Sequence, residues 1–494
     1  MRAMFVSSLG GRGTLAAAAP GQRRRGRLIS AAAVLLLLAG ACDFGGRDDP
    51  EPGRSPLPTP TGSDTHIVGL VGSVSGPDAW RGADAIEGAD LAIGLLNRGL
   101  EPGERPFELL TIDDESDPRL ALKYVRQVAG LERAVGVIYA GPTEALPEAE
   151  RELADAGVPA LALYGDLYGA RRLSPHVFQV GPSYLWEARR ILAYFLGDRR
   201  YLRIGVVVED SLDGRTAAAA LRAAPTRRRA RVLWIERYEE PGDLGPALEN
   251  LKEARAEGLV IQGDPGTFEA ALAELADMGA TYTTTEQARG PRTRKERKRY
   301  EPGDWSPQVA GFDLAISPGL DTPPEGTVAA ETYARGAHYL PIPTLEAFRD
   351  DFLNWWDELP LGFERRSFEA TSALGWAVAH GEGTDLAATL ETIKGRRWGG
   401  LDVTLGPDDH TLAVASTVGL WVIPSSSTSE AEDVPDGLPW VPLARGFSID
   451  GETIDILARD WRYLIAGAPP PKAPPPDFDL LRFGVTSGSK DPVH

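Results

Sequence analysis

The stretch that decides the fold is residues 67–97, IVGLVGSVSGPDAWRGADAIEGADLAIGLLN. An apolar strand at 67–71 runs into a turn of small residues at 73–77, and apolar residues then recur at helical spacing from about Arg81. A strand, a Gly/Ser loop and a helix N-terminus together direct backbone N–H groups into one crevice, which suits a carboxylate or another anion. An ordinary strand-to-helix connection has the same ingredients, so the residues alone leave both interpretations open.

The same alternation of strand and helix continues along the chain. Strands are expected at 66–71, 107–112, 135–140, 159–163, 203–208, 231–236 and 258–262, and helices at 81–97, 118–132, 145–156, 214–223, 243–256 and 266–278. Asp117-Pro118 shows the local signal, because Asp caps a helix and Pro fits its first turn. Alternation of this kind predicts an α/β protein with parallel sheets covered by helices on both faces. The roughly 400 residues concerned are too many for one lobe and suit two.

The N-terminal segment is typical of a secreted protein. Four arginines at 23–27 precede an apolar run of 14 residues at 28–41, which is shorter than the ~20 residues of a spanning helix. We therefore expect a signal peptide at 1–41. Ala39-Gly40-Ala41-Cys42 resembles a lipobox, in which the cysteine is lipidated and becomes the new N-terminus; a stray thiol beside an ordinary secretion signal is the alternative. Cys42 is the only cysteine, so no disulfide forms within the chain. Residues 42–64 are predicted to be a disordered tether.

The charge of the chain argues against a nucleic-acid partner. The net charge is −19, and it becomes −25 without residues 1–41, which hold six arginines and no acid. A basic cluster at 289–299 lies within a predicted loop insertion at 281–308. It is either a solvated loop or a docking patch for an acidic partner or anionic lipid. Near the C-terminus, an Asp-Gly turn predicts a hairpin over 447–457, followed by a Pro-rich tail at 461–494.

No pattern in the sequence indicates an enzyme, a metal or a cofactor. The acids at 113–117 lack the glycine and final glutamate of a calcium loop, so we expect them to cap helices and meet solvent. The six histidines are scattered without the spacing of metal ligands. A nucleophile elbow, an HExxH motif and a P-loop are all missing from the sequence.

The order of the motifs resembles a known family. The pattern SGP-x-A-x-x-G-x-x-x-x-x-G, beginning at Ser75, resembles the first loop of the leucine/isoleucine/valine-binding family of type I periplasmic binding proteins. The resemblance covers roughly 65–425, with further matching segments in the family's order: TIDDESDP (111–118), GVIYAGPTEA (136–145), AGVPALALYGD (156–166), FQVGPSYLWEA (178–188), LRIGVVVEDSLDG (202–214), FRDDFLNWW (348–356), FEATSALGWAVAH (368–380) and RRWGGLDVTLGPDDHTL (396–412).

The resemblance implies a two-lobed fold, in which each lobe is a doubly wound parallel sheet and three hinge crossings join the lobes. It places 65–183 with 344–400 in lobe 1, and 184–343 with 401–460 in lobe 2. It also implies an extracytoplasmic lipoprotein that binds a small polar ligand of the amino acid, amide or amine class. Such a protein delivers its ligand to an ABC permease after hinge closure. A ligand-sensing lipoprotein of the same fold, which signals to a partner without transport, is the alternative.

The residues at the loops that bind ligand in this family depart from the usual set. Amino-acid binders use small hydroxyl residues on lobe 1, and an aromatic residue plus an acid on lobe 2. The matching positions here, with the start of the first helix, are Ser75, Trp80, Arg81, Thr143, Tyr164, Gly165, Asp166, Tyr184, Asp213 and Asp313. Three aspartates among them predict a cationic group on the ligand, while Arg81 and the helix N-terminus would hold an anionic end. Each of these residues is alternatively an ordinary rim residue.

Overall fold

In the computed structural model, the first strand that is described begins at His66. The described residues are 64–166, 175–224, 231–239, 241–281, 305–316, 323–332, 343–360, 363–381, 385–400, 403–413, 418–423, 440–443, 447–449 and 452–454. The predicted signal peptide, Cys42, nearly all of the tether, the basic cluster and the Pro-rich tail lie outside these residues. No helix among the described residues has the length and apolar character needed to cross a bilayer.

The first sheet is entirely parallel, with the strand order β2-β1-β3-β4-β5. Its strands are β1 (His66–Gly72), β2 (Phe107–Asp113), β3 (Ala134–Ala140), β4 (Ala160–Ala162) and β5 (Val177–Gln179). The helices that cover it are α1 (Ala79–Arg98), α2 (Pro118–Ala129), α3 (Ala145–Ala156), α11 (Glu364–His380) and α12 (Leu386–Leu390), with α10 (Pro343–Trp356) packed outside α1. The elements predicted for this half are therefore present, with ends shifted by no more than three residues.

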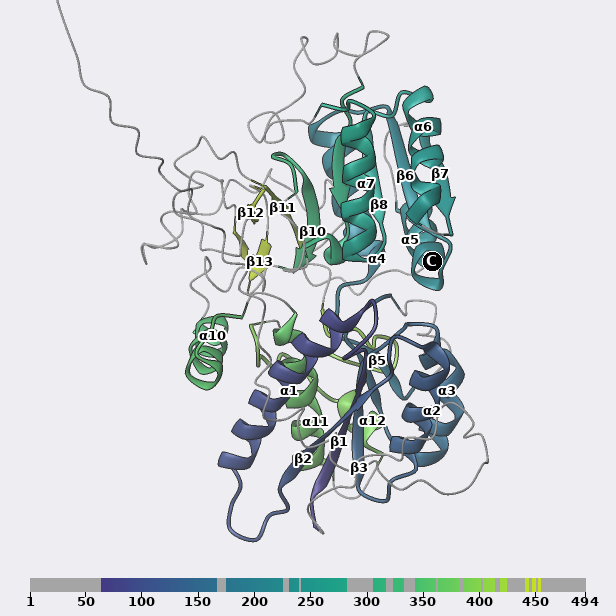
Figure 1. Cartoon of the computed structure of the whole chain (residues 1–494). Coiled ribbons are helices and arrows are strands. Elements are labelled where there is room, and N and C mark those ends of the chain that lie inside the picture. The colour runs from purple at the N-terminus through teal and green to yellow at the C-terminus, as the bar shows by residue number, and fades with distance from the viewer. Residues whose placement is uncertain are drawn as a thin grey trace, which may run out of the picture. The chain divides into compact units, whose positions relative to one another are not determined.

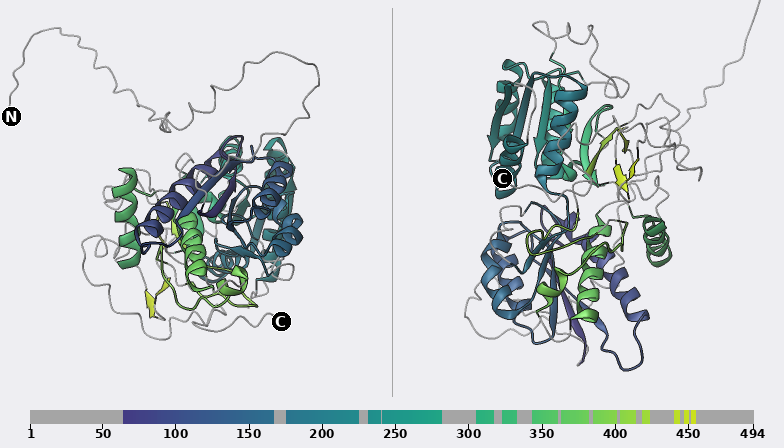
Figure 2. Two further views of the ribbon diagram at one scale, coloured as in Figure 1. Left: turned by 90° about the horizontal axis from the view of Figure 1, so that it is seen from below. Right: turned by 180° about the vertical axis from the view of Figure 1, so that it is seen from behind.

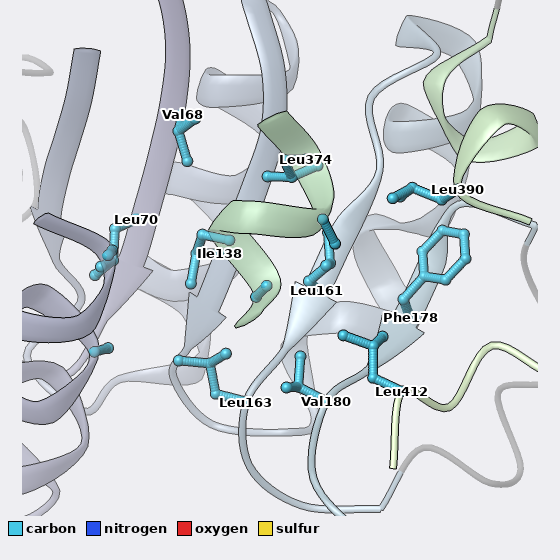
Figure 3. Packing of buried hydrophobic residues seen from close by; sticks show 14 of the residues in the cluster. Val68, Leu70, Ile138, Leu161, Leu163, Phe178, Val180, Leu374, Leu390 and Leu412 are labelled. Atoms are coloured by element: carbon cyan, nitrogen blue, oxygen red, sulfur yellow. The ribbon is translucent and has the colours of Figure 1, made fainter. Parts of the chain in front are cut away.

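Helices cover both faces of this sheet. On one face, α1, α11 and α12 pack over strand residues such as Leu70 and Ile138, together with Leu374 and Leu390 (Figure 3). On the other face, α2 and α3 cover a second apolar cluster that includes Val71. α1 and α11 lie side by side although α1 ends at Arg98 and α11 begins only at Glu364 (Figures 1 and 2). The contact of α1 with α11 is tight because Gly88 lies against the backbone of Glu364, leaving no room for a side chain.

The second sheet has the strand order β12-β11-β10-β9-β8-β6-β7. Its strands are β6 (Arg203–Glu209), β7 (Arg231–Tyr238), β8 (Gly258–Gln262), β9 (Gln308–Gly311), β10 (Val328–Thr332), β11 (Val418–Val422) and β12 (Val441–Pro442). One face of this sheet is covered by α4 (Tyr184–Ala193), its π-helical continuation η2 (Tyr194–Asp198) and α5 (Leu212–Ala223). The other face is covered by η3 (Pro241–Asp243), α6 (Leu244–Glu253) and α7 (Pro265–Asp277). A short 3₁₀ helix, η4 (Asp313–Ile316), follows β9.

The second sheet differs from the expected parallel sheet at one edge. β11 pairs antiparallel with β10, and β12 pairs antiparallel with β11. The pairing register shows how the antiparallel edge arises. Thr332, the last residue of β10, pairs with Val418, the first residue of β11. The chain leaves the sheet after β10 for the first lobe and re-enters it at the same end, so its next strand runs in the opposite direction.

One expected lobe boundary is wrong. The sequence placed 401–460 in lobe 2, but Val403, Leu405 and Leu412 are buried in the apolar cluster of the first sheet. Thr411 also forms a bridge with Gln179 of β5. Ala413 packs in the core of the second sheet, and β11 begins at Val418, so the third crossing follows Leu412 rather than residue 400. The hairpin predicted over 447–457 is present as β13 (Phe447–Ile449) and β14 (Glu452–Ile454), paired antiparallel.

Candidate functional site

The loop between β1 and α1, expected to offer backbone N–H groups to a ligand, binds a carboxylate of the chain itself. Asp113 Oδ1, at the end of β2, accepts hydrogen bonds from the backbone nitrogens of Val74 (2.9 Å), Ser75 (3.1 Å) and Glu115 (2.9 Å). Burial raises the pKa of Asp113, but these bonds and the Ser75 hydroxyl outweigh burial and lower the pKa. Ser75 is exposed and its amide is occupied, so it does not join the other predicted site residues.

The acids that follow β2 stabilise local structure. Asp117 caps α2 by accepting a hydrogen bond from the backbone nitrogen of Arg119 (2.7 Å). Asp114 Oδ1 accepts hydrogen bonds from Ser73 Oγ (2.7 Å) and the backbone nitrogen of Ser116 (3.0 Å). Within the described ranges no three His, Cys, Asp or Glu side chains come together as a group able to hold a metal ion.

Arg81, in the first turn of α1, is a buried cation among aromatic rings. The residue is 7% exposed, and its Cζ lies 5.4 Å from the ring centre of Trp80 and 5.6 Å from that of Tyr164. The Tyr164 hydroxyl donates to the backbone oxygen of Arg81 (3.1 Å). Tyr164 in turn meets Trp80 and Phe363 edge to face, with ring centres 5.2 and 5.6 Å apart. Trp80 and Tyr164 therefore form the wall that positions Arg81.

The Arg81 guanidinium donates no hydrogen bond to any residue that the structure describes. Its Nε is buried without a hydrogen-bond partner, and its ion pair with Asp78 joins Nε and Oδ1 across 3.6 Å, too far for a hydrogen bond. Burial lowers the pKa of Arg81, but Asp78 and Asp213, with Tyr164 and Tyr184, outweigh burial and raise it. Arg81 is therefore a permanent cation whose donors are unused.

Asp213, in the first turn of α5, contacts two loops of the first lobe. Its Oδ2 accepts a hydrogen bond from Thr143 Oγ1 (2.9 Å), and its Oδ1 accepts one from the backbone nitrogen of Asp166 (3.3 Å). Gly165 makes this approach possible: its φ is +75°, and a Cβ there would lie 2.7 Å from Asp213 Oδ1 and closer still to Thr143 Oγ1. Burial raises the pKa of Asp213 to about 7, although Arg81 and Thr143 oppose this shift.

Tyr184 carries the matching unused donor on the second lobe. It is the first residue of α4 and is 1% exposed. Its ring meets Phe312 edge to face, with centres 5.1 Å apart, and its buried hydroxyl has no hydrogen-bond partner in the described part of the chain. Asp213 is the charged group that most raises the pKa of Tyr184 after burial. Its backbone nitrogen donates to Asp166 Oδ2, and the Asp166 amide donates to Asp213, so the start of α4 lies at the loop that Asp213 contacts.

Asp166 and Asp313, expected to meet a cationic ligand, are instead committed to the protein. Asp166 Oδ2 accepts hydrogen bonds from Ser183 Oγ (3.1 Å) and the backbone nitrogen of Tyr184 (2.6 Å), which fixes the start of α4. Asp313 lies 2.6 Å from Arg366 Nη2 and also accepts a hydrogen bond from the backbone nitrogen of Leu314 (2.9 Å). The chain's own groups therefore satisfy both carboxylates.

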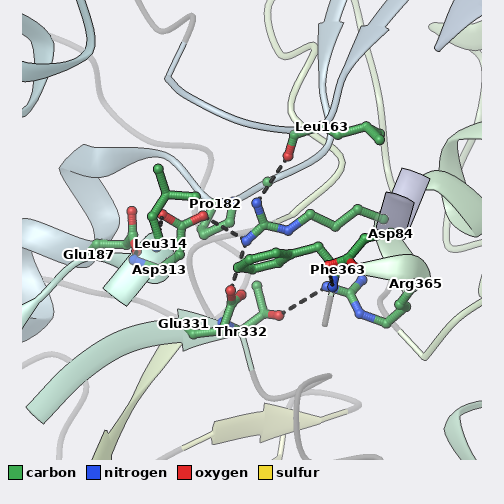
Figure 4. Close-up of polar contacts among 12 residues, drawn as sticks. Asp84, Leu163, Pro182, Glu187, Asp313, Leu314, Glu331, Thr332, Phe363 and Arg365 are labelled. Carbon is green, nitrogen blue, oxygen red and sulfur yellow. Dashed lines mark hydrogen bonds and ion pairs between the residues drawn. The ribbon is translucent and has the colours of Figure 1, made fainter. Parts of the chain in front are cut away.

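Arg366 is the centre of a buried ionic cluster that the sequence did not reveal. Its Nη2 lies between Asp313 and Glu331 (2.6 and 2.7 Å), and its Nη1 donates to the backbone oxygen of Leu163 (3.0 Å). Figure 4 shows Asp313, Glu331 and Leu163 converging on this point. The guanidinium is wholly buried and lies 4.3 Å from the ring centre of Phe363. Burial lowers the pKa of Arg366, but Glu331 and Asp313 outweigh burial and raise it.

This ionic cluster joins the two sheets. Arg365 and Arg366 lie in the first turn of α11, which covers the first sheet. Glu331 lies in β10 of the second sheet, and Asp313 begins η4, which follows β9 of that sheet. Arg365 pairs with Glu369 one turn further along α11 and reaches Thr332 Oγ1 at 3.4 Å. A sequence signal was available, since two adjacent arginines precede the mostly apolar run of 368–379. The two acids that pair with Arg366, 53 and 35 residues away, carried no comparable signal.

Of the predicted site residues, the structure gathers five around one point where the lobes meet. We call this group the inter-lobe site: Arg81, Thr143 and Gly165 from the first lobe, with Tyr184 and Asp213 from the second. Trp80 and Tyr164 form its wall. Ser75, Asp166 and Asp313 have other roles.

Comparison with known proteins shows which family and which solved structures this chain is similar to. Residues 67–290 match the family described as "Periplasmic binding protein". Among solved structures, a type 1 periplasmic binding protein from Bordetella pertussis Tohama I is 16% identical with a TM-score of 0.61, and the match covers 77% of this chain and 100% of that one. No curated protein sequence matches the chain.

Two further structures have known ligands. A branched-chain amino acid transporter substrate-binding protein from Streptococcus pneumoniae, in complex with isoleucine, is 13% identical with a TM-score of 0.55; the match covers 73% of this chain and 96% of that one. A solute-binding protein of an ABC transporter from Rhodopseudomonas palustris BisB5, in complex with 3,4-dihydroxybenzoic acid, is 16% identical with a TM-score of 0.56. That match covers 76% of this chain and 96% of the other.

The two helix-covered sheets and these matches establish that the chain has the type I periplasmic binding protein fold. They confirm the resemblance to the leucine/isoleucine/valine-binding proteins of ABC transporters that the sequence indicated. At these identities the likeness extends to the fold alone.

Proposed function

We propose that this protein is an extracytoplasmic solute-binding protein that closes around a small polar ligand and delivers it to an ABC importer. The observation that supports the proposal best is the unused pair of donors at the inter-lobe site. The Nε of Arg81 comes from one lobe and the Tyr184 hydroxyl from the other, and both atoms are buried without a hydrogen-bond partner among the described residues. Buried donors in folded proteins are nearly always paired, so a bound solute is the natural partner for both.

The mechanism that follows is hinge closure. A ligand first meets one lobe and then bridges both, which shifts the equilibrium between open and closed forms because it binds the closed form better. The contacts of Thr143 and the Asp166 amide with Asp213 are contacts that separation of the lobes would break. A transporter that recognises only the closed form would then distinguish loaded from empty protein. This role is binding, and no step in it requires catalysis.

The ligands of the structural neighbours are consistent with a small solute that carries a carboxylate. The Streptococcus protein holds isoleucine and the Rhodopseudomonas protein holds 3,4-dihydroxybenzoic acid. The two compounds share a carboxyl group, whereas only isoleucine has an ammonium group. Arg81 suits the shared group. The cationic ligand expected from three aspartates has weaker support, since Asp166 and Asp313 are already satisfied within the protein.

A thermal-shift screen of the full chain tests the proposal. Amino acids, small amides, polyamines and carboxylates are screened in turn. A ligand at 100 times its dissociation constant should stabilise the protein by about 2.7 kcal/mol, which raises the melting temperature by a few degrees for lobes of this size. A shift with any class supports solute binding, and no shift across the panel contradicts it. Binding without importer-dependent uptake would favour the ligand-sensing alternative.

We also propose that Cys42 carries a lipid that anchors the protein to the cell membrane. The lipobox-like Ala39-Gly40-Ala41-Cys42 supports this anchor. Cys42→Ser should give unprocessed or soluble protein, and mass spectrometry of the mature N-terminus should show an acyl mass on Cys42. Cleavage elsewhere without added acyl mass contradicts the anchor.

A further inference from the structure

We propose that the inter-lobe site binds organic acids through their carboxylate group and that its ligand requires no ammonium group. The inference rests on the proposed solute-binding function and narrows its ligand class. It comes from a contrast within the structure: the donors that would hold an anion are unused, and the acids that would hold an ammonium are already occupied.

The unused donors come from both lobes. Arg81 is 7% exposed and Tyr184 1% exposed, and neither the Arg81 Nε nor the Tyr184 hydroxyl has a hydrogen-bond partner in the part of the chain described. Asp166 links Tyr184 to Asp213, because its carboxylate binds the Tyr184 amide and its own amide binds Asp213. The two oxygens of Asp213 are already bound by Thr143 Oγ1 and the Asp166 amide. A carboxylate with several lone pairs can accept from a guanidinium and a phenol together. A ligand carboxylate would therefore pair both donors and join the two lobes.

The acids that could receive an ammonium group are satisfied by the protein. The family resemblance places Asp313 where an acid meets the ligand ammonium, but here Arg366 Nη2 lies 2.6 Å from Asp313 and 2.7 Å from Glu331. Arg366 is wholly buried between them, so a ligand cation would have to displace a side-chain cation. Asp213 is a weak cation site because burial raises its pKa to about 7, leaving it partly neutral near neutral pH.

Two matched series of compounds test the contributions of the ligand's carboxylate and ammonium groups separately. Leucine, 4-methylpentanoate and 3-methylbutylamine share one apolar group and carry both charges, the carboxylate alone, or the ammonium alone. Phenylalanine, 3-phenylpropanoate and 2-phenylethylamine do the same with an aromatic group. Dissociation constants for the full chain are measured by calorimetry at pH 7.5 and at one ionic strength, because the expected contacts depend on charge.

We expect the carboxylate-only compound of at least one series to bind at least tenfold more tightly than its amine, and no more weakly than its amino acid. Tighter binding of the amine, or tenfold tighter binding of the amino acid, would overturn the inference and leave the solute-binding function intact. If none of the six compounds binds but the wider screen yields amides or polyamines, the inference again fails alone. If no compound of any class binds, the proposed function fails as well.

Two variants test the residues assigned. Arg81→Met should weaken binding of the carboxylate about 100-fold or more, because its main charged donor is lost. Arg119→Met, which removes an exposed arginine of the same lobe, is the control and should leave binding unchanged. Tyr184→Phe should weaken binding about tenfold through loss of one hydroxyl donor. Unchanged carboxylate affinity in Arg81→Met would overturn the inference, as would equal loss in Arg81→Met and Arg119→Met.

Discussion

Two buried arginines lie near the same aromatic ring and have opposite surroundings. The Cζ atoms of Arg81 and Arg366 are 5.6 and 5.9 Å from the ring centre of Tyr164. Arg366 is bound by two carboxylates and a backbone carbonyl, and only its Nε is unpaired. Arg81 has one distant ion pair and no side-chain hydrogen bond within the described residues. The contrast separates a cation that joins the lobes from one that makes no side-chain hydrogen bond to any residue that the structure describes.

The largest effect is expected from Arg366→Met. The substitution leaves Asp313 and Glu331 buried without their cation, which should lower the free energy of unfolding by about 3–5 kcal/mol. Arg126→Met is the matched control, because Arg126 pairs with Glu152 at 2.7 Å but both side chains are partly exposed. That control should change stability by about 0–1 kcal/mol. Urea unfolding measures both, and equal losses would contradict a structural role for Arg366.

Gly165→Ala tests the close approach of the two lobes. Gly165 has φ +75° and its Cα faces Asp213 and Thr143, so a methyl group would both strain the backbone and push the lobes apart. Gly157→Ala is the control, because Gly157 has φ +66° and a Cβ there would meet no atom within 4 Å. Strain alone costs about 1–2 kcal/mol. Gly165→Ala should cost more than the control and should also weaken ligand binding, whereas an equal cost would show that the approach does not matter.

The pH dependence of stability tests the surroundings of Asp213. Its pKa is about 7 in the folded protein against 3.8 ordinarily, so the folded state retains a proton that the unfolded state loses between these values. The stabilising contribution is complete below about pH 4 and is lost as pH rises through 7. The groups that interact with Asp213 are Arg81, Thr143, Glu144, the Asp166 amide and Tyr184.

Asp213→Asn, which is neutral at every pH, should therefore gain about 2–3 kcal/mol relative to the parent between pH 5 and pH 8. Urea unfolding of both proteins at the two pH values provides the measurement. A difference that stays constant with pH would show that Asp213 is ionised throughout.

The smallest effect is expected from Arg81→Met on the protein without ligand. Because the guanidinium makes no hydrogen bond within the described residues, its loss should change the free energy of unfolding by less than about 1 kcal/mol, or raise it. The same change at Arg366 supplies the comparison. A loss of several kcal/mol at Arg81 would mean that this arginine, like Arg366, is structural.

Much of the fold could be predicted because its signals are local. The strands and helices between 66 and 278 follow from apolar periodicity and from caps such as Asp117-Pro118, and the structure places them within a few residues of expectation. The antiparallel edge of the second sheet could not be predicted, since it depends on where the chain re-enters that sheet. The lobe boundary near residue 401 failed for a related reason: Val403 and Leu412 are apolar residues that fit either core.

The candidate site, like the fold, could be predicted from the sequence only in part. The sequence by itself determined which residue types lie at the ends of the strands, because strand, loop and helix follow one another within a few residues. The predicted site residues therefore included Arg81, Thr143, Gly165, Tyr184 and Asp213. Only the tertiary structure decided which charges are free. Asp313 and Arg366 are 53 residues apart, and a side chain's partner in a dry interior depends on which elements pack together across the lobes.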